Sequence, residues 1–491
     1  MAKAEDITPI RKQYLEIKHQ YPNAILFFRL GDFYETFDQD AEIAARELDI
    51  VLTSRPVGKG VRVPLAGIPH HAVENYLARL IERGYHVAIC EQVGDQPDRG
   101  IFPRQVVRVV TPGTLMETGL LPADANNYLA CVTVQENRAG VAYADISTGE
   151  FAVTEISSDD TGVGLRAELS RLHPAEILYP EDSQLPDGLS GHLTGWHPWR
   201  FELSRCQDAL LTHFSVASLD GFGLRGMSLG VQAAGAIVQY LTETQPAALK
   251  LLKELNTYST SEFMVLDAST RRNLELTETL RAGNVQGSLL GELDRAVTPM
   301  GKRLIRQWVS KPLLDVEAIH ARQLGVSYLF EQGMLRAELR AALKPLSDLE
   351  RLTTRLVSGT AQPRDLVGLR STLQRLPGIR QLFLQPTPDG DSGNPQFARQ
   401  LKPLLKDFNT CSDELVLVEN AVADDPPATL QNTGVIRTGF SAELDGVIDR
   451  SRHAREWIAN LEVVERERTG IKTLKVGYNK VFGYYIEITR A

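Results

Sequence analysis

The hydrophobic pattern of this 491-residue chain changes its period near residue 230, and this change sets what the chain can fold into. Before that point, short apolar runs alternate with helical patterns, which indicates mixed α/β folding. Beyond Gly230, strand patterns almost vanish and apolar residues recur at helical spacing as far as residue 376. We therefore expect a multidomain protein in which α/β domains are followed by an all-α part.

A stretch near the N-terminus joins an apolar strand to a second strand that carries two aromatic rings and a carboxylate. The apolar run breaks at Gly31, and Phe33, Tyr34 and Glu35 follow within a few residues. Because successive side chains on a strand face opposite ways, Phe33 and Glu35 should share one face. By itself the pattern favours core packing beside a solvated acid. The alternative is a nucleic-acid probe, in which the ring enters a base step and the carboxylate meets a base edge.

The first part of the chain, residues 1–114, is predicted to form one mixed α/β domain. Helical patterns, apolar strands and turn residues alternate through it, as expected for helices packed on a sheet. The segment 53–60 has no clear strand pattern and is expected to be a loop. Its cations Arg55 and Lys59 either contact phosphates or are simply solvated.

Residues 125–250 are predicted to form a second α/β domain. Three alternating apolar runs between 129 and 154 are separated by turn residues, which indicates an antiparallel meander. Asp145 and Glu150 lie at ends of these runs, and paired carboxylates on a sheet can hold a divalent metal for phosphodiester cleavage. Acids are also common beside turns, and no third or fourth carboxylate occupies a matching place. A metal-dependent nuclease is therefore an alternative and not the main interpretation.

The helical part divides into residues 260–440 and 441–491. The first segment is expected to be a scaffold of packed helices. In the second, helical spacing continues to Thr469, and roughly 30 residues in one helix would span about 45 Å. Two short alternating runs follow, which predict a β-hairpin with Asn479 and Lys480 at its turn.

Composition narrows the class of protein. Hydrophobic residues make up 43% of the chain and charged residues 23%, as in ordinary globular proteins. The formal net charge of −9 argues against a wholly basic surface for nucleic acid, although a local basic strip is compatible with it. The four scattered cysteines lack a Cys-x-x-Cys spacing, and no apolar leader or membrane-length run is present. We expect reduced thiols, a cytoplasmic protein and no membrane contact.

Several blocks of sequence, taken together and in order, resemble the MutS family of bacterial mismatch-recognition proteins. The similarity starts at Gly-Asp-Phe-Tyr-Glu, residues 31–35, and extends to the end of the chain. The other blocks that carry it are residues 64–77, 88–95, 107–114, 266–275, 298–301 and 474–479. Because these blocks occur in the same order as in that family, the resemblance is specific.

The resemblance implies a function and a domain order. Members of this family bind mispaired or looped duplex DNA, and the matching Phe33 and Glu35 would insert, kink and probe the site. The implied domains are a mixed α/β mismatch-recognition domain (1–114), a ribonuclease-H-like connector (125–250), a helical core and lever domain (260–440), and a lever helix with the start of an incomplete β clamp (441–491). Candidate contacts to the DNA backbone are Leu30, Arg55, Lys59, His71, Lys475, Asn479 and Lys480.

The resemblance also implies partners and a location. Its DNA partners would be duplexes with mismatches or small loops. Full-length members of the family form homodimers and recruit MutL, and they act in the bacterial cytoplasm in association with the nucleoid. No membrane partner is expected.

The chain departs from the family pattern in one respect. The phosphate-binding motif Gly-x-x-x-x-Gly-Lys-Ser/Thr does not occur in it. Full-length members carry their ATPase, which uses ATP and Mg, after the region matched here. We therefore expect this chain to have no catalytic residues, no metal or nucleotide site and no cofactor of its own. Two rival interpretations remain: the nuclease on the ribonuclease-H-like domain, and a helical interaction scaffold that does not bind DNA.

Overall fold

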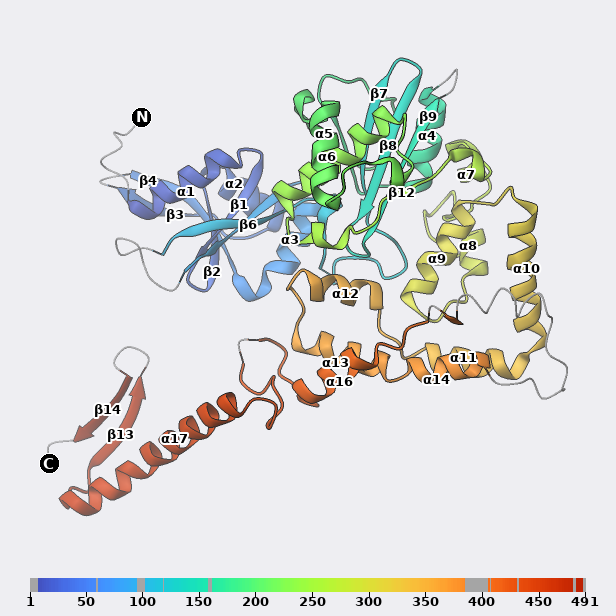
Figure 1. Cartoon of the computed structure of the whole chain (residues 1–491). Coiled ribbons are helices and arrows are strands. Elements are labelled where there is room, and N and C mark those ends of the chain that lie inside the picture. The colour runs from blue at the N-terminus through green and yellow to red at the C-terminus, as the bar shows by residue number, and fades with distance from the viewer. Residues whose placement is uncertain are drawn as a thin grey trace. The chain divides into compact units, whose positions relative to one another are not determined.

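In the computed structural model the chain folds into two compact units (Figure 1). The first contains Met1–Ala361 and Arg375–Asn409, and the second contains Gln362–Gln374 and Thr410–Ala491. The structure describes residues 8–58, 61–94, 102–117, 119–157, 161–384, 405–406, 408–430, 432–479 and 483–488. Within these ranges, no helix is both long enough and apolar enough to cross a lipid bilayer.

The first unit begins with a six-stranded mixed sheet. In spatial order its strands are β3 (Thr53–Gly58), β4 (Val61–Pro69), β2 (Phe33–Phe37), β1 (Ala24–Leu30), β5 (His86–Gln92) and β6 (Arg104–Val110). β1 and β5 are parallel, and the other neighbours are antiparallel. One face packs against α2 (Asp38–Leu48) and α3 (Val73–Glu82), and α1 (Pro9–Gln20) covers part of the other. The predicted mixed α/β architecture of this region is therefore confirmed.

The expected loop at 53–60 is wrong, because residues 53–58 form the edge strand β3. Arg55 pairs with Val63 of β4, and the register shifts between Pro56 and Gly58. Proline is tolerated on an edge strand and at a bulge, where its missing N–H leaves no ladder bond unmade. Pro56 and the neighbouring glycines therefore gave this strand the composition of a loop. Lys59 lies outside the described residues.

A second six-stranded sheet follows. Its order is β11 (His192–Trp196), β10 (Glu176–Pro180), β7 (Leu129–Gln135), β8 (Arg138–Asp145), β9 (Glu150–Ser157) and β12 (Asn256–Thr257). The predicted meander is confirmed, since β7, β8 and β9 are antiparallel neighbours, whereas β10 runs parallel to β7, β11 parallel to β10, and β12 parallel to β9. α4 (Thr161–Leu172) covers one face, and α5 (Leu203–Phe214) and α6 (Ser228–Thr244) form the other layer.

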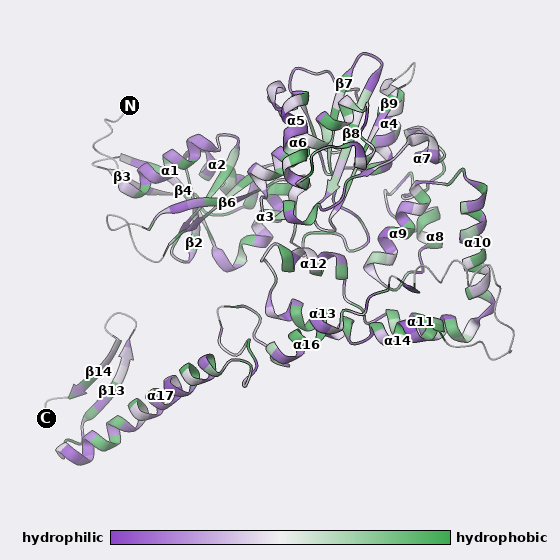
Figure 2. Ribbon diagram, viewed as in Figure 1, coloured by the Kyte–Doolittle hydropathy of each residue, from purple (hydrophilic) through white to green (hydrophobic). Residues whose placement is uncertain are grey.

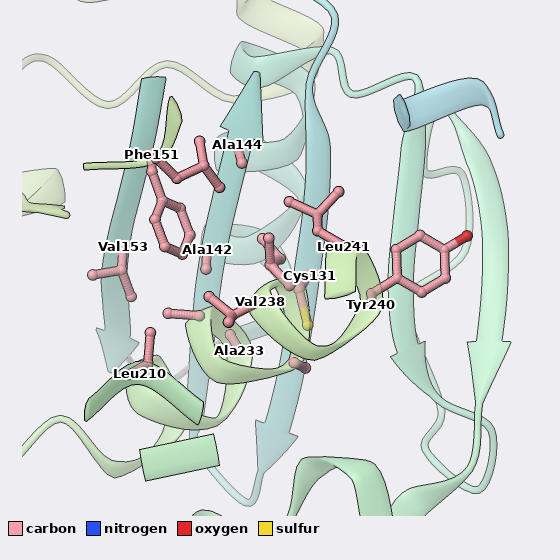
Figure 3. Close-up of a cluster of buried hydrophobic side chains, with 14 of the residues drawn as sticks. Cys131, Ala142, Ala144, Phe151, Val153, Leu210, Ala233, Val238, Tyr240 and Leu241 are labelled. Atoms are coloured by element: carbon pink, nitrogen blue, oxygen red, sulfur yellow. The ribbon is translucent and has the colours of Figure 1, made fainter. Parts of the chain in front are cut away.

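The core of this second domain lies between α6 and the meander. Figure 3 shows Cys131, Ala142, Phe151 and Val153 of the strands directed toward α6 and Leu210 of α5. Small residues permit this close approach: a Cβ on Gly140 of β8 would lie only 2.2 Å from the carbonyl oxygen of Leu229.

The rest of the first unit is helical. Its helices are α7 (Ala268–Asn273), α8 (Leu289–Leu293), α9 (Pro299–Ser310), α10 (Val316–Glu331), α11 (Gly333–Leu343), α12 (Leu349–Val357) and α14 (Leu376–Leu384). Short 3₁₀ helices are η1 (His70–Ala72), η2 (Pro112–Thr114), η3 (Pro198–Phe201), η4 (Asp220–Phe222), η5 (Ala248–Leu251) and η6 (Thr260–Glu262). Thr298 caps α9, because its side chain accepts a hydrogen bond from the Gly301 amide.

Three arginines attach these helices to the loop that precedes the second sheet. Arg303 donates to the Ala123 carbonyl at 3.0 Å and forms ion pairs with Asp348 and Glu350. Arg351 donates to the Pro122 and Ala125 carbonyls at 2.9 and 2.8 Å, and Arg306 donates to the Asp124 carbonyl at 3.1 Å. The arginines therefore bind the backbone of the loop, which fixes its path.

The second unit contains α13 (Pro363–Leu373), α16 (Ser412–Ala421), α17 (Ala442–Thr469) and the hairpin of β13 (Leu474–Asn479) and β14 (Gly483–Ile488). The predicted long helix is confirmed: α17 has 28 residues, starts at the Ser441 cap and ends at Gly470, whose φ is 70°. Hydrophilic and hydrophobic residues are both distributed along its length (Figure 2). The hairpin is confirmed as well, with Asn479 paired to Gly483.

Glu176 joins the end of the first α/β domain to the second sheet. Its carboxylate is fully buried and accepts hydrogen bonds from the Thr111 hydroxyl and from the Gly113 amide at 2.9 Å. The hydroxyls of Thr194 and Tyr240 donate to the other oxygen at 2.7 and 2.8 Å. A buried carboxylate with this many donors is stable only while all of them stay in place.

Glu176→Gln should loosen this junction. An amide can accept at only one end, so its NH₂ group would face two donors and leave buried groups unpaired, at a cost of about 3 kcal/mol. Hydrogen exchange should show loss of protection at the Gly113 amide, and chemical unfolding should show the lower stability. Glu181→Gln is the control, because Glu181 is half-exposed and pairs only with His197 among the described residues. Equal effects of the two substitutions would contradict the role given to Glu176.

Lys311, which directly follows α9, contacts Tyr143 of the second sheet and two aromatic rings beyond its last strand. Its Nζ lies 4.9 Å from the Tyr258 ring centre, 5.5 Å from that of Phe263 and 3.5 Å from the Tyr143 hydroxyl. Burial, and next the charge of Arg171, lower the pKa of Lys311 to about 8.

Lys311 should make stability rise with pH. The ordinary pKa of lysine is 10.5, so between about pH 8 and 10.5 the unfolded chain binds more protons than the folded chain. The penalty for burying the charge is therefore full below pH 8 and is relieved as the pH rises. Lys311→Met removes this contribution. Chemical unfolding across the window should show the wild type gaining stability relative to Lys311→Met, and a constant difference would rule the effect out.

Candidate nucleic-acid interface

A tight, braced turn carries the predicted probe. β1 and β2 are joined by Gly31 and Asp32, with Leu30 paired to Phe33. Gly31 has a φ of 61°, which favours glycine at this position. The Arg29 side chain donates to the Gly31 carbonyl at 2.5 Å, and the His70 amide of η1 donates to the Asp32 carbonyl at 2.9 Å. The turn is therefore held from both sides.

Phe33 is exposed and Tyr34 is buried, as the predicted alternation requires. The exposed fraction is 47% for Phe33 and 4% for Tyr34. Tyr34 stacks on Phe27 with ring centres 6.1 Å apart, and its hydroxyl donates to Glu91. Burial and this hydrogen bond raise the pKa of Tyr34. The buried neighbour anchors β2, so Phe33 projects from a fixed backbone and is not part of the core.

Glu35 lies on the same face of β2 as Phe33 and is paired with a cation. Its carboxylate accepts a hydrogen bond from Arg55 of β3, and its side chain is only 18% exposed. Glu35 is opposite Gly67 of β4, where a Cβ would lie 3.8 Å from Glu35 Cγ and 3.9 Å from Phe33 Cδ1. The structure thus brings Phe33, Glu35 and Arg55 together, although Arg55 was expected only as a phosphate contact or a solvated charge.

Two other predicted contacts flank this turn. Leu30 is half-buried at the end of β1, directly opposite Phe33. His71 is exposed in η1, next to His70, whose amide holds the turn. Burial, and next the charge of Arg29, lower the pKa of His70.

The remaining predicted contacts belong to the hairpin of the second unit. Lys475 is exposed on β13, and Asn479 is half-buried at the end of that strand. Lys480 lies outside the described residues. The sequence interpretation missed two exposed rings here, Tyr478 and Tyr484, which are cross-strand partners with ring centres 5.0 Å apart. The position of each ring beside the expected hairpin turn was the signal that could have identified them.

The sequence interpretation also missed two arginines that support the turn. The Arg29 guanidinium lies 5.5 Å from the centre of the Tyr34 ring, and Arg104 donates to the Arg29 carbonyl at 2.6 Å. Arg104 also lies 5.0 Å from the Phe28 ring, and its burial lowers the pKa of Arg104. Arg29 could have been identified from the sequence, because it is a cation inside the otherwise apolar strand β1.

Asp145 and Glu150 do not form an open metal site. Asp145 is fully buried and accepts hydrogen bonds from Asn126, the Asn127 amide, and the amide and hydroxyl of Ser147. Tyr128 and Gln307 donate to Glu150. Burial raises the pKa of Glu150. Nor do the described residues contain any cluster of three or more His, Cys, Asp or Glu side chains placed to hold a metal ion. These carboxylates therefore have structural partners, and the nuclease interpretation is not favoured.

Fold and site together define a multidomain protein, in which an exposed ring projects from the first of several domains. Comparison with known protein families agrees with this class: the chain matches MutS domain I over residues 8–119, MutS domain II over 127–253 and MutS domain III over 269–479. The chain belongs to the MutS family, as its sequence blocks predicted.

Similar proteins support this assignment. A Dehalococcoides mccartyi protein is 46% identical over 491 residues, covering 99% of this chain and 56% of its own length. Proteins from Alkaliphilus oremlandii and Thermosynechococcus vestitus are each 44% identical, covering 99% of this chain and 55% and 56% of their own lengths. All three are named DNA mismatch repair protein MutS. The chain thus spans slightly more than half the length of these curated relatives.

Magnesium should not stabilise the second domain specifically. Because both oxygens of Asp145 and Oε2 of Glu150 already accept protein hydrogen bonds, a cation that binds these atoms would have to displace those donors. Thermal unfolding in MgCl₂ should match that in KCl of equal ionic strength, and a labelled duplex should remain uncut. Magnesium-specific stabilisation that disappears in Asp145→Asn would instead restore the metal-site interpretation.

Proposed function

We propose that this chain is the DNA-recognition part of a mismatch repair protein, and that it binds mispaired or looped duplex DNA by inserting Phe33. The observation that carries the proposal is the exposed Phe33 ring beside the Glu35 carboxylate on a braced turn. The names of the relatives support the same activity. DNA is the partner because the ring and the carboxylate match a base step and a base edge.

Discrimination would come mainly from the deformability of DNA. A mispaired step is poorly stacked, so opening it for a ring and kinking the duplex costs less than at a paired step. The anchors behind Phe33 matter here because a wedge must stay fixed while it separates the bases. Tyr34, Arg29 and Arg104 supply those anchors through their contacts with the core and the turn.

Glu35 would add selectivity against ordinary duplex. Its carboxylate is repelled by DNA phosphates, and only a displaced base that donates a hydrogen bond offsets that repulsion. A matched duplex supplies no such donor at low cost. The same side chain therefore favours mispaired DNA and disfavours matched DNA.

We extend the proposal to the other domains. The order and directions of β11, β10, β7, β8 and β9 support a ribonuclease-H-like connector. The helices beyond it would form the core and levers, and α17 with its hairpin would form the lever helix and part of the clamp. In this scheme Leu30, Lys59, His71, Lys475, Asn479 and Lys480 contact the DNA backbone.

The proposal places nucleotide chemistry elsewhere in the protein. Residues 1–491 contain no Gly-x-x-x-x-Gly-Lys-Ser/Thr motif, so this portion would bind DNA without a cofactor, and ATP and Mg would act in other parts of the family's proteins. Homodimer formation, recruitment of MutL and a place beside the bacterial nucleoid belong to the same proposal.

Phe33→Ala should abolish the preference for mispaired DNA. Loss of the ring removes a stacking contribution of about 1–3 kcal/mol, which corresponds to roughly 5- to 150-fold weaker binding of a G·T duplex. Fluorescence anisotropy with a G·T duplex and its matched control measures both dissociation constants. Phe102→Ala, which removes a ring 38% exposed in the same domain, is the control and should keep the preference. An unchanged ratio of the two constants in Phe33→Ala would refute the wedge, and no binding even at low salt would favour a helical scaffold.

A further inference from the structure

Arg55 forms an ion pair with Glu35, the residue that is proposed to accept a hydrogen bond from a displaced base. Arg55 Nη1 donates to Oε2 of Glu35, and the side chains are 39% and 18% exposed, respectively. The two residues come from different strands, β3 and β2, with β4 between them. This contact therefore crosses β4, the strand that lies between β3 and β2.

The strand register explains how the two side chains meet. Glu35 is opposite Gly67 and Arg55 is opposite Val63, and residues 67 and 63 of β4 share one face of the sheet. Gly67 has no side chain, so the surface beside Glu35 stays open on that strand. Phe33 lies on the same face, two residues from Glu35, and the pair is therefore beside the exposed ring.

The pair changes what DNA meets at this surface. A free carboxylate would be repelled by the phosphates, and the guanidinium of Arg55 offsets part of that repulsion while the ion pair persists. An ion pair this accessible to water is weak and screened by salt. A phosphate, by contrast, can accept two hydrogen bonds from one guanidinium and competes well for arginine. On DNA, Glu35 and a phosphate therefore compete for Arg55.

We infer that Arg55 is a specificity-determining residue that covers Glu35 in the free protein and on matched DNA, and moves to a phosphate only when a displaced base takes its place on Glu35. The inference rests on the proposed function of Phe33 and Glu35. On matched DNA, releasing Arg55 would expose an unpaired carboxylate to phosphates, so the ion pair persists. On mispaired DNA both groups find new partners at once, and Arg55 adds a phosphate contact to that complex alone.

The salt dependence of binding tests this exchange. Each phosphate contact contributes about 0.9 to the slope of log Kd against log salt concentration. Arg55→Gln should lower the slope for a G·T duplex by about that amount and weaken its binding about three- to tenfold, but leave the slope for matched duplex nearly unchanged. In a Glu35→Gln background Arg55 is free to bind phosphate on either duplex. There, Arg55→Gln should lower both slopes equally.

Controls separate this inference from simpler roles. Arg62→Gln removes a cation of β4 whose guanidinium donates hydrogen bonds to Ser54 and not to Glu35. This substitution should change the binding of both duplexes to the same extent. Arg55→Lys keeps the charge and should keep the difference between the two slopes, which covers the case in which Arg55→Gln fails to fold.

The outcomes distinguish two failures. If the wild type prefers G·T duplex and Phe33→Ala loses that preference, the proposed function stands. An equal fall of both slopes in the single variant Arg55→Gln would then overturn the exchange alone. If Phe33→Ala keeps the wild-type ratio, the proposed function fails first, and the inference about Arg55 fails with it. The result we expect is a fall confined to the G·T duplex in the single variant Arg55→Gln, and an equal fall on both duplexes in the Glu35→Gln background.

Discussion

The buried carboxylate of Glu176 is the interaction on which the arrangement of the two sheets depends. It accepts hydrogen bonds from Thr111 and Gly113, which end the first α/β domain, and from Thr194 and Tyr240 of the second. A buried carboxylate is costly unless its oxygens are hydrogen-bonded, so these four donors favour the observed geometry of the junction. The first sheet, and the turn that it presents, inherit their position from this junction.

The turn itself combines an exposed ring with a fully supported backbone. The side chains of Tyr34, Arg29 and Arg104, which support the backbone of the turn, form hydrogen bonds and ring contacts. The Phe33 side chain itself stays 47% exposed to solvent. An apolar ring left exposed on an otherwise well-packed strand is not explained by stability, because burying it would be favourable. The proposed insertion of Phe33 into a base step would account for this exposure.

The sequence predicted features that depend on local pattern, and it failed where distant residues meet. The alternation of Phe33 and Tyr34, the meander and the 28-residue α17 all follow from short-range periodicity and were confirmed. β3 was missed because Pro56 on an edge strand resembles a loop. The pairing of Arg55 with Glu35, 20 residues away, could not be read from spacing. Nor could spacing identify the groups that donate hydrogen bonds to Asp145, since they come together only after folding.

The loop before the second sheet is recognised through its backbone. Arg303, Arg306 and Arg351 bind carbonyl oxygens of residues 122–125, and every amino acid has such an oxygen. The identity of most side chains in the loop can therefore drift in evolution without loosening the joint, whereas each arginine is hard to replace. We therefore expect amino-acid substitutions to be tolerated in the loop, and to be rare at the arginines of the helices that hold it.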